Sequence, residues 1–138
     1  YLTSYASGLQ CIALESNPAF ASVARETFKQ ARNPIDLREG DYTDLLPKAL
    51  EDMEAVDFVY FNMQDDDICC SSLFNKCVEQ IHQNSVFFFK GIKSSSKMRI
   101  AWKEICSHPK VTVTMDLYAL GIVFFNDKLH KRNYITYY

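Results

Sequence analysis

Apolar residues along this chain form two alternating patterns, short continuous runs and longer helical stripes. The runs predict buried strands over residues 10–14, 35–39, 56–61 and 85–90. The stripes, with apolar residues three and four positions apart, predict helices near residues 18–33, 47–53, 73–81 and 98–108. Ser16 or Asn17 can cap the first helix, with Pro18 in its first turn. Strands that alternate with helices in this way are typical of an α/β protein with parallel strands.

The pattern changes near the C-terminus. Apolar and polar residues alternate over residues 111–117, which is the period of a strand with one half-exposed face. A short connection at residues 118–120 leads to another apolar run at residues 121–125, so these two strands must be antiparallel neighbours. Residues 134–138 fit a last edge strand. We therefore predict one α/β domain over residues 1–138, closed by an antiparallel hairpin.

Composition and charge narrow the function classes. Of the 138 residues, 48% are apolar and 23% are charged, as in ordinary globular domains. A net charge of −2 argues against a general nucleic-acid or membrane-surface binder. The apolar runs are far shorter than the roughly 20 residues of a membrane span. Five cysteines without a C-x-x-C pair argue against a disulfide framework or zinc site and favour the reducing cytoplasm.

Polar residues directly follow the four predicted parallel strands. Ligands of such sheets bind beyond the carboxyl ends of the strands. The candidates at these ends are Glu15, Asp41, Asn62 and Lys90. Because the carboxyl ends of parallel strands share one edge of a sheet, we expect these side chains to form the ligand site.

These positions and the C-terminal pattern resemble the class I S-adenosylmethionine-dependent methyltransferases, and most of all their O-methyltransferase-like branch. The resemblance rests on CIALE ending at Glu15, the REGD turn ending at Asp41, the strand VDFVYF, and the stretch KVTVTMDLYALGIVFF. It covers nearly the whole chain, and its most specific part is the closing D-L-x-x-x-G-I-V-F-F pattern. It implies a three-layer, Rossmann-like sheet of parallel strands with a C-terminal antiparallel hairpin.

The resemblance also implies cofactor-binding residues. In the family, the acid after the second strand accepts hydrogen bonds from the ribose hydroxyls of S-adenosylmethionine, and here that acid is Glu15, followed by Ser16. The aspartate of the Gly-Asp turn meets the adenine amine, which implies Asp41, with Tyr42 beside it at the ring. The alternative for Glu15 is a carboxylate that stabilises the start of a helix. The alternative for Asp41 is an ordinary turn aspartate.

The two later strand ends depart from the family's metal-binding pattern. Many members place an Asp after the strand matching residues 56–61 and an acidic pair after the next one, and these carboxylates hold a divalent cation. Here Asn62 and Lys90 stand at these positions, and a lysine would repel the cation. We therefore expect no catalytic metal ion. Asn62 would lie near the sulfonium or the acceptor, and Lys90 would orient an acceptor oxygen. The acidic run at residues 65–67 is interpreted as a solvated loop and helix cap.

The family's first strand and its glycine-rich cofactor loop should precede Tyr1, and this chain contains no such sequence. That strand is central in the family's sheet. We expect that a longer natural protein supplies it, that another chain does, or that its two neighbours pair directly.

Three functions are compatible with these observations. The leading hypothesis is a metal-independent methyltransferase that acts on a small-molecule acceptor, with the chain as given inactive alone. The alternative is a catalytically inactive methyltransferase-fold protein that serves as a binding or oligomerisation module. A dinucleotide-binding oxidoreductase half would instead have an all-parallel sheet without the closing hairpin. Tyrosines at positions 118, 134, 137 and 138 are candidates for a homodimer contact or a substrate wall.

Histidines and a pair of adjacent cysteines are the other candidate reactive groups of the chain. Cys69 and Cys70 stand at a helix start, which can lower the pKa of a thiol, but no partner base is placed beside them. His82, His108 and His130 are far apart in sequence and are expected at the surface or at helix ends. No nucleophile or metal ligand is predicted among them.

Overall fold

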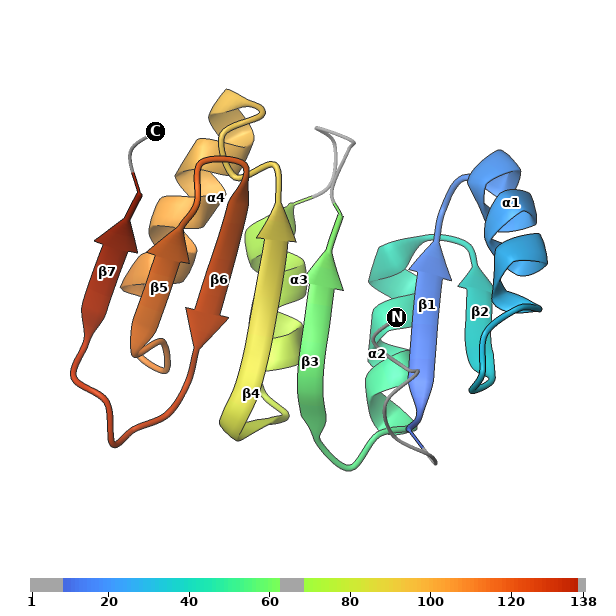
Figure 1. Cartoon of the computed structure of the whole chain (residues 1–138), viewed down its shortest axis with the longest axis horizontal. Helices are drawn as coiled ribbons and strands as arrows, with labels where there is room; N and C mark the ends of the chain where they lie inside the picture. Colours follow the sequence, from blue (N-terminus) through green and yellow to red (C-terminus); the bar gives the residue numbers. More distant parts are fainter. Residues whose placement is uncertain (1–8, 63–68, 137–138) are drawn as a thin grey trace. The chain divides into compact units, whose positions relative to one another are not determined.

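The computed structural model describes residues 9–62 and 69–136. The chain divides into two compact units, Tyr1–Asp52 and Met53–Tyr138, here called unit 1 and unit 2. Each unit is built around its own sheet, with two strands in unit 1 and five in unit 2 among the described residues (Figure 1).

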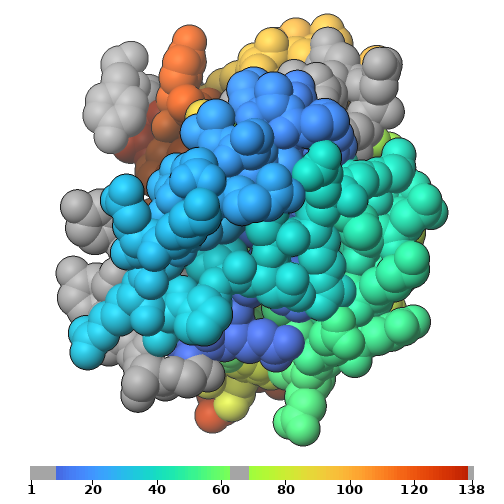
Figure 2. Space-filling view, turned by 90° about the vertical axis from the view of Figure 1, so that its right-hand side faces the viewer, coloured from blue at the N-terminus to red at the C-terminus, as the bar shows by residue number. Residues whose placement is uncertain are grey.

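Unit 1 is a pair of parallel strands with two helices. Its elements are β1 (Cys11–Glu15), α1 (Pro18–Phe28), β2 (Ile35–Glu39) and α2 (Tyr42–Glu51). Strands β1 and β2 end at the same level, since Glu15 is the register partner of Glu39. Helix α1 packs on both strands and α2 packs on β1. Figure 2 shows unit 1 face on, with the blue surface of α1 above the cyan segment that leads to β2 and beside the teal surface of α2.

Side-chain caps start both helices of unit 1. Asn17, one of the two predicted caps, accepts a hydrogen bond from the backbone N–H of Ala19 and caps α1. Asp41 caps α2, which therefore begins five residues before the predicted start at residue 47. The predicted start was wrong, because the helix begins at its Asp41 cap and Pro47 lies inside it.

Unit 2 contains the predicted hairpin. Its elements are β3 (Val56–Phe61), α3 (Cys70–Val78), β4 (Ile81–Lys90), α4 (Ser96–Ser107), β5 (Val113–Asp116), β6 (Leu120–Phe124) and β7 (Arg132–Ile135). The strand order is β3-β4-β6-β5-β7. Strand β3 pairs parallel with β4, whereas β6 is antiparallel to both β4 and β5. The α/β class and the closing hairpin are confirmed, and the hairpin contradicts the all-parallel sheet of the oxidoreductase alternative.

The core of unit 2 lies between its sheet and the helices α3 and α4, which both lie behind the sheet in Figure 1. Alternate residues of β4, Phe87 and Phe89, are fully buried and pack against Phe74 of α3. Phe89 also contacts Trp102 of α4, with ring centroids 5.8 Å apart. Aromatic contacts of this kind pack both α3 and α4 against strand β4.

Strand boundaries of unit 2 differ from the prediction by up to four residues: β5 begins two residues later than predicted, β6 lies one residue earlier, and β4 begins four residues earlier. Ile81 begins β4 instead of ending the preceding helix, because the polar residues after it are satisfied within the sheet. The buried Ser85 hydroxyl donates to the Val56 carbonyl at 2.6 Å and accepts from the His82 N–H at 2.8 Å. Strand β7 begins two residues earlier than predicted, and residues 137–138 of that prediction lie outside the described residues.

No helix in the described part of the chain is both long enough and apolar enough to cross a membrane.

Candidate functional site

The carboxyl ends of β1 and β2 bring three predicted site residues of unit 1 together. The backbone N–H of Gly40 donates to the Glu15 carbonyl at 3.0 Å and joins the two strand ends. Gly40 has φ +148°, a conformation that favours glycine, and it leads directly into Asp41 and Tyr42. The Tyr42 hydroxyl lies 3.4 Å from Oε1 of Glu15. Glu15, Asp41 and Tyr42, here called the carboxyl edge of unit 1, are therefore neighbours, and their cofactor role stays a prediction.

The half-buried Glu15 carboxylate has one oxygen engaged and one available. Oε1 accepts the backbone N–H of Asn17 at 2.8 Å, which fixes the side chain at the start of α1. Within the described residues, no hydrogen bond reaches Oε2. A fixed carboxylate with an available oxygen can accept hydrogen bonds from a ligand with adjacent hydroxyl groups. Ser16 is also half-buried and follows in the bend before Asn17.

Asp41 has a structural role as well as its predicted position. Its Oδ1 accepts the backbone N–H of Thr43 at 2.7 Å and the hydroxyl of Thr43 at 2.5 Å. These bonds satisfy a donor that the first turn of α2 would otherwise leave unpaired. Asp41 is therefore the cap of α2, and its predicted contact with the adenine amine stays a prediction.

In unit 2, Asn62 and Lys90 lie at adjacent strand ends. Their predecessors Phe61 and Phe89 are register partners in the parallel pair β3–β4. Both Asn62 and Lys90 are exposed. Among the residues that the structure describes, the Lys90 ammonium makes no hydrogen bond or ion pair. The Lys90 ammonium does not fit a divalent cation, because magnesium and calcium sites use anionic and neutral oxygen ligands, and the Asn62 amide alone would supply one such oxygen.

Metal-ligating side chains do not gather elsewhere in the described ranges. Within residues 9–62 and 69–136, no group of three or more His, Cys, Asp or Glu residues could hold a metal ion. The acidic run at residues 65–67, interpreted from the sequence as a loop and helix cap, lies outside these ranges.

Sequence reasoning missed an ion pair beyond the ends of β4 and β5. Lys93 Nζ lies 2.9 Å from Oδ1 of the buried Asp116 and 5.1 Å from the centroid of the Tyr118 ring. The same Asp116 oxygen accepts the backbone N–H of Tyr118, a residue in the left-handed region at φ +67°. Lys93 lies shortly before Ser95, which caps α4. The aspartate of the D-L-x-x-x-G pattern was the available signal.

The thiols of the described cysteines do not form a reactive site. The pKa of the Cys70 thiol is raised to about 12, mainly by burial and further by Cys69 and Cys77. The suggestion that the helix start lowers this pKa is therefore wrong, because Cys70 is buried within α3 packing and not exposed at the helix end. All five cysteines are free.

The histidines have separate surroundings. His82 Nε2 lies 2.8 Å from Asp57 Oδ1, across the β3–β4 pair. Burial and the charges of Lys110 and Lys131 lower the pKa of His108, which follows α4. His130 lies in the segment between β6 and β7.

Comparison with solved structures shows which fold these sites occupy. An O-methyltransferase from Bacillus cereus, solved with S-adenosylhomocysteine, has a TM-score of 0.66 and 15% identity over 86% of this chain and 64% of its own. A methyltransferase from Podospora anserina, also with bound S-adenosylhomocysteine, has a TM-score of 0.67 and 12% identity over 86% of this chain and 61% of its own. TomG, an O-methyltransferase of tomaymycin synthesis from Streptomyces achromogenes, was solved with S-adenosylmethionine. It has a TM-score of 0.68 and 12% identity over 88% of this chain and 64% of its own.

These likenesses define a class by its fold. The chain has the fold of class I S-adenosylmethionine-dependent methyltransferases of the O-methyltransferase type, so the resemblance seen in the sequence is confirmed at this level. The chain spans slightly less than two thirds of the length of each of these structures. No family model matches the sequence, and no curated protein matches it.

Proposed function

We propose that this chain is part of an S-adenosylmethionine-dependent O-methyltransferase that methylates a small-molecule acceptor without a metal ion. The observation that carries the proposal is the Glu15 carboxylate, which is held by Asn17 and has an available oxygen at the carboxyl edge of unit 1. The fold is shared with O-methyltransferases solved with S-adenosylmethionine or its product. The proposal includes one methyltransferase-like domain over residues 1–138, which is supported by likenesses that each extend over 86% or more of the chain.

In unit 1, the proposed task is to hold the nucleoside. Oε2 of Glu15 accepts the ribose hydroxyls, and Ser16 lies beside this contact. The Tyr42 side chain contacts the adenine ring, and Asp41 accepts from its amine. A hydrogen bond to a charged group contributes about 1.5–3 kcal/mol, so the two carboxylates, Glu15 and Asp41, contribute more than the uncharged Ser16 and Tyr42.

In unit 2, the proposed task is to position the acceptor. When bound, S-adenosylmethionine would supply a methyl group on a sulfonium; the S–CH₃ bond would break as the O–CH₃ bond formed, and the acceptor proton would leave to solvent. Lys90 donates to the acceptor oxygen and stabilises it as it loses its proton, and Asn62 orients the acceptor. Most of the rate enhancement then comes from holding two reactants in line.

Calorimetric titration of a longer protein that contains this chain with S-adenosylhomocysteine tests the proposal, since the chain alone is expected to be inactive. We expect Glu15→Gln to weaken affinity about 10- to 100-fold, as for the loss of a charged hydrogen bond. Glu39→Gln is the matched control, because Glu39 ends the neighbouring strand but pairs with Arg25 at 3.2 Å. An equal effect of both variants would remove Glu15 from the site. No heat at millimolar ligand would discard methyl transfer and favour the non-enzymatic binding or oligomerisation module.

Setting and partners form the last part of the proposal. Five free cysteines support a reducing, cytoplasmic setting. The exposed Ile135 on the edge strand β7 supports a homodimer contact. The net charge of −2 supports a small-molecule partner rather than a nucleic acid. Analytical ultracentrifugation tests the dimer, and a monomer at 100 µM (about a hundred times a 1 µM dissociation constant) would refute it.

A further inference from the structure

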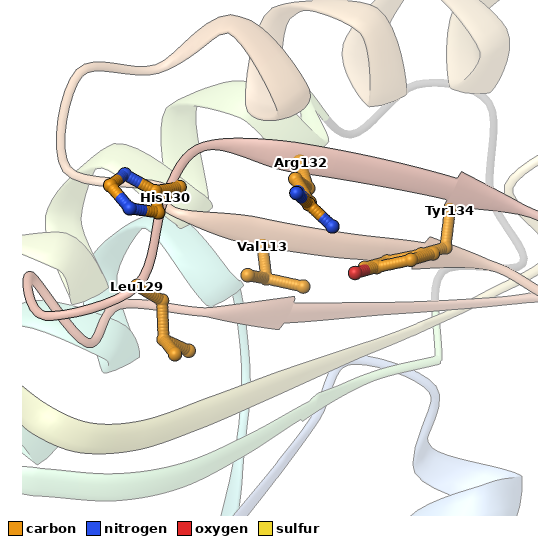
Figure 3. A pocket seen from close by; sticks show the side chains of 5 residues that line it. All are labelled: Val113, Leu129, His130, Arg132 and Tyr134. Atoms are coloured by element: carbon orange, nitrogen blue, oxygen red, sulfur yellow. The ribbon is translucent and has the colours of Figure 1, made fainter.

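A small open pocket lies where β7 joins the sheet of unit 2. Its volume is about 200 Å³, and it is lined by Val113, Leu129, His130, Arg132 and Tyr134. In Figure 3 the side chains of Arg132 and Tyr134 extend from β7 toward Val113 of β5, and Leu129 and His130 lie on the segment before β7. The pocket therefore combines a basic end with an apolar and aromatic wall.

Strand β7 is held firmly enough to present these side chains. The Arg132 N–H donates to the Thr112 carbonyl and the Thr136 N–H donates to the Asp116 carbonyl, each at 2.9 Å. Between them, Asn133 Oδ1 accepts the Thr114 hydroxyl at 2.8 Å. Because side chains alternate along a strand, Asn133 lies on one face of the sheet and Arg132 on the other.

The positive charge at this pocket is not neutralised. Four of the five residues 128–132 are basic or histidine, and none of the lining residues is acidic. Lys131 is engaged elsewhere, because its Nζ donates to the Ser107 and His108 carbonyls at 3.3 and 3.2 Å. Within residues 9–62 and 69–136, neither the Arg132 guanidinium nor the His130 ring forms an ion pair or hydrogen bond. A guanidinium in this state has its planar set of donors available for a carboxylate.

We propose that this pocket binds a small organic carboxylate with an apolar body. Arg132 forms the paired hydrogen bonds to the carboxylate, and the basic segment raises the local concentration of anions. The Tyr134 ring and the Val113 and Leu129 side chains contact the body of the ligand. The volume is below the 300–1,000 Å³ of pockets for drug-sized ligands, so the ligand has about the size of one aromatic ring with its carboxylate.

The site is separate from the proposed methyl-transfer residues of unit 2. Val113 begins β5 and, through Phe124 of β6, stands level with Val86, four residues before Lys90 on β4. No methyl donor is needed for this binding. A negative result in the test below therefore overturns the pocket proposal and leaves the methyltransferase proposal untouched.

Titration of the ¹⁵N-labelled 138-residue chain by NMR tests the pocket, with benzoate as the probe. We expect saturable shifts of the amides of residues 129–134, and a weaker response to acetate, which has the charge without the body. Benzyl alcohol, which has the body without the charge, should cause no saturable shift. Arg132→Gln should weaken benzoate binding at least tenfold, and Tyr134→Ser about threefold.

Lys128→Gln is the matched control, because it removes a charge from the same segment at a residue that does not line the pocket. It should change benzoate affinity less than twofold. Both Arg132 and Tyr134 are exposed, so the variants should keep the wild-type spectrum outside the pocket. Equal weakening by Lys128→Gln and Arg132→Gln, or inorganic phosphate that binds as tightly as benzoate, would show attraction by charge alone and overturn the proposal. Absence of saturable shifts at 20 mM benzoate (about 2 kcal/mol of binding free energy) would also overturn it.

Discussion

At Gly121 the hairpin strand β6 approaches α4 so closely that no side chain fits. A Cβ at this position would lie 2.5 Å from Cη2 and 2.6 Å from Cζ3 of Trp102, and 2.9 Å from Cγ2 of Ile92. Carbon atoms in contact are about 3.5–4.0 Å apart, so the added methyl overlaps the indole by about 1 Å. Trp102 is 8% exposed and Ile92 is fully buried, so neither can move aside without displacing its neighbours.

The expected cost of Gly121→Ala follows from this overlap. Overpacking a core costs about 1–3 kcal/mol, and simultaneous overlap with two ring atoms and a buried methyl places this variant near 3 kcal/mol. For a domain of ordinary stability, about 5–15 kcal/mol, that is a fifth or more of the free energy of unfolding. Urea unfolding of the 138-residue chain followed by far-ultraviolet circular dichroism measures it, and the midpoint should fall without a change of slope.

A double-mutant cycle with Trp102→Leu is the control. This change removes the ring atoms that the new methyl would meet, although it destabilises the chain by itself because a large core side chain is lost. In the Trp102→Leu background, Gly121→Ala should cost at least about 1 kcal/mol less than in the wild type. The reasoning is refuted if the free energy of unfolding of Gly121→Ala alone lies within about 0.5 kcal/mol of the wild-type value. It is also refuted if the substitution costs the same free energy in both backgrounds.

Two further predictions concern polar groups of unit 2. Ser85→Ala should lower the free energy of unfolding by about 2 kcal/mol in urea titrations, because it leaves the Val56 carbonyl and the His82 N–H without the buried hydroxyl; a loss no larger than that of the exposed Ser107→Ala would contradict this. Because burial and nearby lysines lower the pKa of His108, the unfolded chain takes up a proton first as the pH falls. Stability should therefore decrease from pH 7.5 to pH 5.5, and His108→Asn should reduce that decrease in urea midpoints; equal decreases would rule out His108 as the source.

Strands were more predictable from the sequence than helix starts. The bounds of β2 and β3 are those that the apolar runs predict, and β2 is flanked by Pro34 and Gly40, which stop a strand on either side. Helix α2 was misplaced because its start depends on one side-chain bond, from the Thr43 N–H to Asp41, that an apolar stripe does not contain. The first part of β4 was missed because Ser85 is satisfied by residues of its own strand and of β3. Local pattern predicts which segments are buried, whereas these two boundaries depend on individual hydrogen bonds.

Some candidate sites could be predicted from the order of the strands, and the pocket beside β7 could not. Parallel pairing alone makes Glu15 and Asp41 neighbours in unit 1, and makes Asn62 and Lys90 neighbours in unit 2, so these groupings follow from strand order. The pocket beside β7 does not follow from strand order. It needs β7 to return beside β5 after an intervening segment, with Arg132 on the face opposite to Asn133. A basic segment in the sequence gives no indication of such a return.

The charges at the ends of β4 and β5 distinguish Lys93 from Lys90, to which we assign a role in the proposed reaction. Asp116 lies 2.9 Å from Lys93, and the same ammonium lies over the Tyr118 ring, so the charge of Lys93 is already balanced. Lys90 has no such partner among the described side chains. Phe89 is buried against the helices, so alternation places Lys90 on the opposite face of the sheet. An acceptor oxygen that loses its proton would be stabilised by Lys90, and the same unbalanced charge would repel a divalent cation.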